Sequence, residues 1–120
     1  EQGRGAQEPS PSQAGGGVIF SNAPPEVYVD YARMYAMVGK YDKTAWALEE
    51  FVKKVPGDWR AWLDLASVHM VLGNTNSAVR DITQALTFGG NDALTSINQD
   101  QRFAPIRDKI KDSGKIQIQP

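Results

Sequence analysis

The 120-residue chain contains no cysteine and a single histidine, His69. Without cysteine it can form neither disulfides nor thiolate metal sites, and it has no thiol nucleophile. One imidazole cannot supply the several ligands that a zinc site needs. Asp92 and Asp100 lack the spacing of a calcium loop, and the triplet at residues 15–17 is not followed by the Lys and Ser or Thr of a phosphate loop. We therefore expect no metal and no cofactor.

An excess of positive charge and a long apolar run are also missing. Lys and Arg number 13 and Asp and Glu 14, which gives a net charge of −1. Nucleic acids and anionic membranes attract clustered cations, but the densest cationic stretch, residues 102–115, is interrupted by Asp108 and Asp112. No apolar run approaches the roughly 18 residues of a membrane helix. The sequence thus predicts neither nucleic-acid binding nor membrane insertion of this segment.

The two ends differ in composition from the rest. Residues 1–17 are dominated by Gly, Gln, Pro, Ser and Glu and hold no large apolar side chain. Such a segment cannot offset its ordering entropy, so we predict a flexible tail or linker over residues 1–23 and another tail over residues 113–120. The apolar strip at residues 18–20 either docks on the folded part or is an incidental patch. Because the chain begins at Glu1, we expect it to be a piece of a longer protein.

Helical patterning begins at Pro24. Predicted helices end at Gly39, at Pro56–Gly57, at Gly73 and at Gly89–Gly90, with Asp42 as the N-cap of the second. The predicted apolar stripe of the first helix consists of Val27, Tyr31, Met34, Tyr35 and Val38.

The helical pairs repeat with a period of 34 residues. Shifted by that number, the following residues coincide, and at most of these places their sizes are similar: Tyr28 with Trp62, Tyr31 with Leu65, Ala32 with Ala66, Gly39 with Gly73, Leu48 with Ile82, and Phe51 with Ala85. Two unrelated hairpins would not keep one register over this span.

A helix-turn-helix period of 34 residues resembles the tetratricopeptide repeat family, in its bacterial type. The resemblance implies an all-α fold of antiparallel helix-turn-helix repeats, which form a short right-handed α-solenoid with capping helices. It places this domain at residues 24–112, with repeat one at about 25–57, repeat two at about 59–90 and an atypical cap at about 92–112. The sequence departs from the family pattern at Thr44, His69, Thr75 and Gly90.

The predicted cap begins at Asp92 and includes the stretch Asp100-Gln-Arg-Phe-Ala-Pro-Ile106, which is similar to an ending found in bacterial members of the family. Its apolar side chains are expected to cover the exposed edge of repeat two, because a stack of repeats needs a cap. They are Leu94, Ile97, Phe103, Ile106 and Ile110.

Catalysis is not expected. His69 should point inward without a partner, since Asp64, five residues earlier, projects from another face. Glu49 and Glu50 each precede a lysine by four residues, which indicates a solvated helix face rather than an acid–base pair. We therefore predict that the chain is not an enzyme.

The resemblance implies a concave groove lined by the first helix of each repeat. Here it would consist of Val29, Arg33, Ala36 and Met37 from repeat one and Leu63, Ser67, Met70 and Val71 from repeat two. Val29 and Arg33 replace the Lys and Asn with which some members hold a carboxylate. The surface instead suits a peptide or helix of a partner protein, bound by apolar contacts.

Three alternatives remain open at this stage. The groove could be filled by the strip at residues 18–20, by the C-terminal segment, or by a second copy of the chain. In the last case the function would be structural self-association of the parent protein as a homodimer. The compartment is equally open, either bacterial cytoplasm or bacterial envelope.

Overall fold

The computed structural model describes residues 23–112, and the side chains as far as Asp108. The predicted tail over residues 1–23, except for Ala23, lies outside the described residues, as do the predicted tail over residues 113–120, the strip at residues 18–20 and the side chain of Ile110. The described part consists of five α-helices and one 3-10 helix: α2 (Pro25–Met37), α3 (Tyr41–Lys54), α4 (Trp59–Val71), α5 (Thr75–Gln99), η2 (Gln101–Phe103) and α6 (Ala104–Asp112).

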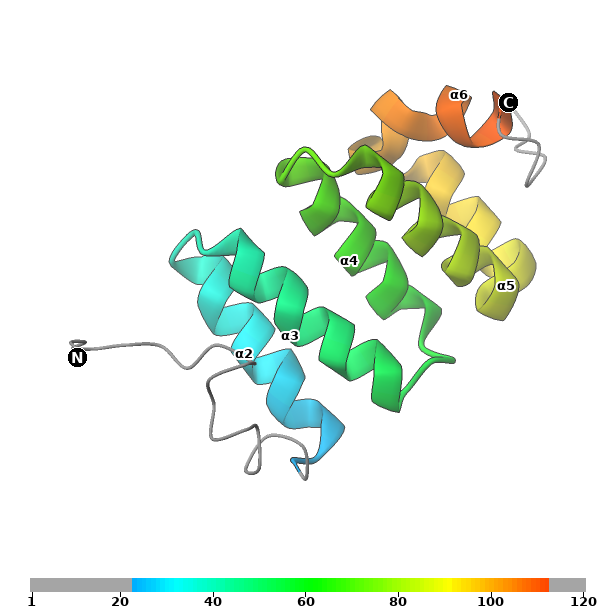
Figure 1. The fold of residues 1–120 in the computed structure, drawn as a ribbon. Helices are drawn as coiled ribbons and strands as arrows, with labels where there is room; N and C mark the ends of the chain where they lie inside the picture. The colour runs from blue at the N-terminus through cyan, green and yellow to red at the C-terminus, as the bar shows by residue number, and fades with distance from the viewer. Residues whose placement is uncertain (1–22, 113–120) are drawn as a thin grey trace.

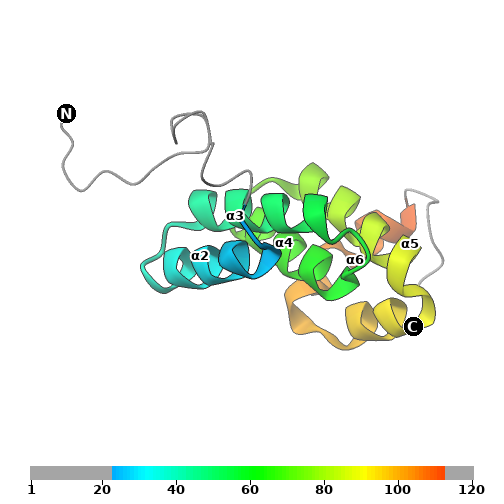
Figure 2. The same ribbon diagram turned by 90° about the horizontal axis from the view of Figure 1, so that it is seen from below.

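The helices form two antiparallel hairpins that stack side by side (Figure 1). The first consists of α2 and α3, and the second of α4 and the first part of α5. Each element packs chiefly against the next one in the chain, with α3 joining the hairpins by its contact with α4. Figure 2 shows that the segment after α5 folds back beside the second hairpin. This arrangement confirms the prediction of an all-α repeat fold.

The 34-residue period recurs in the backbone. Helices α2 and α4 both span 13 residues, from Pro25 and Trp59 respectively. Each is followed by a glycine in the left-handed region, Gly39 with φ 78° and Gly73 with φ 81°. The next amide donates back to the helix in both cases, Lys40 N to Tyr35 O over 2.9 Å and Asn74 N to His69 O over 2.8 Å. The two hairpins are thus closed by the same glycine-dependent helix ending.

Two local predictions for the first hairpin are wrong. Lys40, not Asp42, occupies the N-cap position of α3, and Asp42 lies in the first turn. In α2 the buried residues are Tyr28, Ala32 and Tyr35, whereas Met34 and Val38 are 54% and 66% exposed. The predicted stripe combined two neighbouring faces of one helix, and only one of them packs against α3.

The second hairpin ends at a kink. Gly90 has φ 54° and ψ −132°, so the chain changes direction inside α5, where the sequence predicted a helix boundary. Gly89 lies against the ring of Trp59. A Cβ added to Gly89 would stand only 2.5 Å from Trp59 Cγ. Arg107 then ties the returning chain to the end of α5 by donating to Ile97 O over 3.1 Å and to Asp100 O over 2.7 Å.

Two apolar clusters hold the hairpins. The cluster of repeat one includes α4 residues and consists of Tyr28, Ala32, Ala45, Ala47, Leu48, Phe51, Val52, Ala61 and Leu65. The C-terminal cluster joins repeat two to the cap and consists of Leu63, Ala66, Ala78, Ile82, Ala85, Ala93, Ile97, Phe103 and Ile106. The predicted capping residues Ile97, Phe103 and Ile106 are thus buried, and Leu94 packs partly against them. Thr44, where the family pattern has alanine, is also buried, and its hydroxyl donates to Lys40 O.

Candidate partner-binding site

A buried polar cluster lies where the two hairpins meet. His69 of α4 is 4% exposed. Its Nδ1 lies 2.5 Å from Asp81 Oδ2 in α5, and its Nε2 lies 3.2 Å from Glu49 Oε2 in α3. Arg80 reaches the other Asp81 oxygen, Oδ1, over 3.2 Å. One imidazole therefore joins three helices and both repeats.

This cluster fits a structural role. Asp81 is fully buried, and burial raises the pKa of its carboxyl, although His69 and Arg80 act in the opposite direction. The expectation that His69 would have no partner was wrong, because its partners come from other helices. Glu49 faces His69, while Lys53 pairs with Glu50 over 2.9 Å. Within the described residues no group of three potential ligands could hold a metal ion.

A shallow depression opens between the two hairpins at the end where α2 and α4 terminate. Its volume is about 360 Å³, and its lining is mostly apolar. The lining residues are Tyr41, Ser67, Val68, Met70, Val71 and Arg102. They come from α3, α4 and η2, so the depression exists only because both hairpins and the cap meet there.

The predicted groove residues of repeat two divide between the surface and the core. Ser67, Met70 and Val71 line the depression, and Val71 is 65% exposed. Leu63, in contrast, is 4% exposed and lies in the C-terminal cluster with Ile97 and Phe103. Leu63 is buried because the chain beyond Gly90 folds back over this part of repeat two.

The predicted groove residues of repeat one lie on α2, outside the lining of the depression. Val29 and Ala36 are half-buried, and Val29 packs against the cluster of repeat one. Arg33 is exposed and pairs with Asp30 over 3.1 Å. Met37 is 79% exposed and precedes the lining residue Tyr41 by four residues.

The cap forms one wall of the depression through Arg102. Its guanidinium donates to the Asp100 carboxylate over 2.7 Å and to Ser67 Oγ over 3.2 Å, and lies 3.5 Å from Asp64. The hydrogen bonds from Arg102 hold the pKa of Asp100 below its ordinary value. The arginine is thereby oriented along the wall.

Tyr41, Val68 and Arg102 were missed by the sequence reasoning about the groove. Arg102 belongs to the predicted cap motif, but the positions of Tyr41 and Arg102 in space depend on how the hairpins and the cap pack. No sequence pattern indicated Val68, which also packs against the cluster of repeat one.

Comparison with known proteins agrees with this architecture. Residues 25–68 match the family model of the tetratricopeptide repeat, which covers repeat one and most of α4. Neither the curated proteins nor the solved structures include a significant match to this chain. Among the described helices, none is both long enough and apolar enough to cross a membrane.

Proposed function

Because residues 25–68 of this chain match the tetratricopeptide repeat family model, we propose that the chain binds a peptide or helix of a partner protein at the depression between its hairpins. Repeats of this family generally mediate protein–protein interaction and typically form scaffolds without catalytic activity.

The apolar lining carries the proposal. Val71 and Met37 are 65% and 79% exposed, and the depression beside Val71 is lined largely by apolar side chains. Exposed apolar side chains that gather around a hollow mark an interaction surface more often than scattered ones do. A volume of about 360 Å³ accommodates apolar side chains of a bound segment rather than a folded domain.

The cap covers one part of the predicted groove and leaves another part open. Leu63 is buried beneath the C-terminal segment, and Arg102 closes the hollow on that side. The open surface that we propose includes Met70, Val71 and Tyr41, and the exposed Met37 precedes Tyr41 by four residues. A partner would insert apolar side chains beside Val71, with Arg102 at the rim for a polar or acidic neighbour.

Selection of peptides from a displayed random library against the full chain tests the proposal. The selected peptides should be rich in apolar residues, and the combined change Met37→Glu and Val71→Glu should weaken their binding at least about tenfold, because it places charges beside an apolar hollow. Phe88→Glu is the matched control, since Phe88 is 46% exposed but lies outside the lining. Peptides that bind the double variant as tightly as the unaltered chain would show that the site lies elsewhere.

A further inference from the structure

The outer face of α2, formed by Val27, Tyr31, Met34 and the C-cap residue Val38, has a counterpart one repeat later that packs in part against repeat one. Shifted by 34 residues, these positions become Ala61, Leu65, Val68 and Leu72 of α4. Ala61 and Leu65 are buried in the cluster of repeat one and Val68 packs against it, whereas Leu72 is 38% exposed. On α4 this face therefore makes the contact between the repeats.

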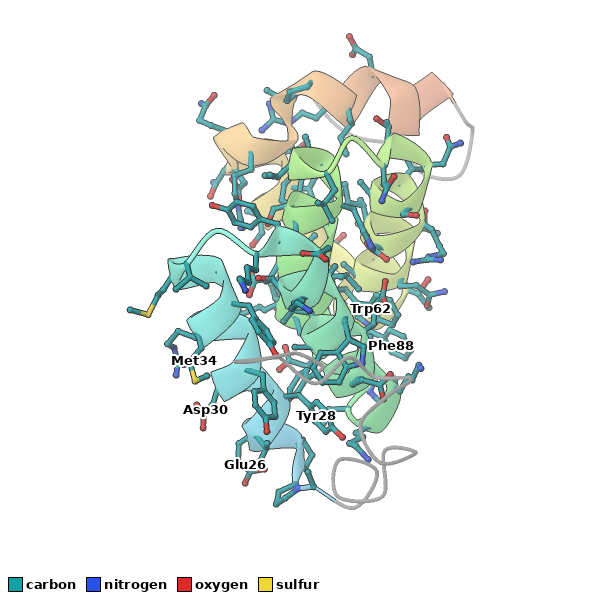
Figure 3. All side chains as sticks on the ribbon, turned by 60° about the vertical axis from the view of Figure 1, so that its left-hand side comes forward. Glu26, Tyr28, Asp30, Met34, Trp62 and Phe88 are labelled. Carbon is teal, nitrogen blue, oxygen red and sulfur yellow. The ribbon has the colours of Figure 1, made fainter. Side chains whose placement is uncertain are left out.

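On α2 the described residues cover only part of the same face. Met34 and Val38 are 54% and 66% exposed, while Val27 and Tyr31 are half-buried. Figure 3 shows Met34, together with Glu26 and Asp30, on the side of α2 that is turned away from the other helices. The chain thus presents, at this end of the stack, an apolar face of the kind that it uses internally to join its repeats.

A head-to-tail stack of copies cannot cover this face. The internal contact joins α4 to Ala45 and Val52 of α3, whose counterparts in repeat two are Val79 and Leu86 of α5. Val79 and Leu86 are already partly buried against the cluster that contains Ile97 and Phe103. The surface that would receive α2 of a neighbouring copy is therefore occupied by the cap.

A symmetric pair of α2 helices is compatible with the sequence of the outer face. A two-fold axis between Ala32 and Arg33 places Val27 opposite Val38, and Tyr31 opposite Met34, because each pair is symmetric about that point. The first contact would be aliphatic, and the second would bring the Met34 sulfur to the exposed part of the Tyr31 ring, which within its own chain lies beside Tyr35 and Trp46.

The charges beside the face do not oppose this pairing. In such a pair, the position of Asp30 along the helix axis would differ by about 3 Å from that of Arg33 in the second copy. It would differ by about 7.5 Å from that of Asp30 in the second copy. The net charge of −1 per chain adds little long-range repulsion between copies. From these observations we infer that the outer face of α2 is a self-association surface, on which a second copy of the chain packs its own α2 in the antiparallel direction.

Sedimentation velocity on the full chain tests the inference. A single helix pair is smaller than a standard interface, so the dimer should form in the micromolar range. The weight-average mass should rise from 13.2 kDa toward twice that value as the concentration increases from about 5 to 500 µM. A chain that stays monomeric throughout would overturn the inference, whether the face is then bare or covered by residues 18–20.

Substitutions identify the face. Met34→Glu combined with Val38→Glu should abolish the concentration dependence and leave the helical circular dichroism intact, because both side chains are more than half exposed. Phe88→Glu is the control and should dimerise like the unaltered chain, since Phe88 lies on α5. A dimer that survives the double change would place the interface on another surface.

Introduced cysteines test the direction of the pairing, since the chain has none of its own. A mixture of the single variants Val27→Cys and Val38→Cys should give a disulfide-linked dimer on mild oxidation, and neither variant alone should do so efficiently. Efficient linkage within either single variant would overturn the antiparallel arrangement.

Discussion

At the scale of single residues, the polar cluster around His69 determines how firmly the two repeats are joined. The imidazole lies between a fully buried carboxylate, Asp81, and the carboxylate of Glu49, whose side chain is 42% exposed. A buried charge is tolerated when each of its hydrogen-bonding groups has a partner, and loss of one partner leaves the other uncompensated. The cluster therefore stabilises the contact between the repeats because each of its buried polar groups has a partner, and not because any single contact is strong.

His69→Ala should lower the free energy of unfolding by about 3 kcal/mol, because Asp81 would remain buried without its nearest partner. Urea denaturation followed by circular dichroism measures this change. Glu49→Gln should cost at most about 1 kcal/mol, since Glu49 is partly in solvent. Combining His69→Leu with Asp81→Leu should recover much of the loss. If the double variant is as unstable as His69→Ala, the cluster has a role beyond neutralising a buried charge.

At the scale of elements, the corner between α5 and α6 depends on a few charged side chains. Asp100 accepts from the Arg102 backbone N–H over 2.9 Å and from its guanidinium, while Arg102 reaches Ser67 of α4. Arg107 donates to the carbonyls at the end of α5. These contacts give a physical reason for the Asp, Arg and Phe of the cap motif, since Phe103 is then held fully buried.

Stability should depend on Asp100 in acid. Because the pKa of Asp100 is lowered from 3.8 in the folded chain, its contribution is present above about pH 3.8 and is lost as the pH falls through its lower folded value. Asp100→Asn should therefore reduce the unfolding free energy by about 1 kcal/mol near neutral pH, and the difference from the unaltered chain should vanish in strong acid. Comparing the variant with the unaltered chain isolates the effect of Asp100 from that of Asp81, because Asp81 is present in both chains. The raised pKa of Asp81 changes stability with pH in the opposite direction. Equal differences at pH 7 and pH 2.5, measured by urea titration, would contradict this assignment.

The elements that the sequence predicted well are those fixed by local chemistry. Gly39 and Gly73 end their helices because a left-handed residue is required there, and the spacing of small and large residues places α2 to α5. The contact of Glu49 with His69 spans 20 residues and depends on the angle between the hairpins. Likewise, Leu63 is buried only because the chain reverses after Gly90, and no periodicity within α4 indicates that reversal.

At the scale of the whole molecule, the two ends of the stack differ in how far their apolar side chains are covered. At the C-terminal end, Ile97, Phe103 and Ile106 cover repeat two, whereas at the other end Met34 and Val38 are 54% and 66% exposed and no described element covers them. A repeat that lacks its neighbour exposes an apolar face, so each end must be capped or find a partner. The difference between the ends is what allows association at one of them without growth into an open filament.

Removing the cap should therefore destabilise the molecule more than the number of deleted residues suggests. A chain that ends at Gly90 would expose Leu63 and Ile82, which are 4% and 0% exposed in the intact fold. We expect it to lose cooperative urea unfolding or to aggregate, because several large apolar side chains would lose their cover at about 1.5–3 kcal/mol each. A chain that ends at Asp112 is the control and should unfold like the full chain, since the buried cap residues are retained. If the chain that ends at Gly90 remains monomeric and as stable as this control, repeat two does not need the cap, and the surface that we consider closed to a neighbouring copy would be open.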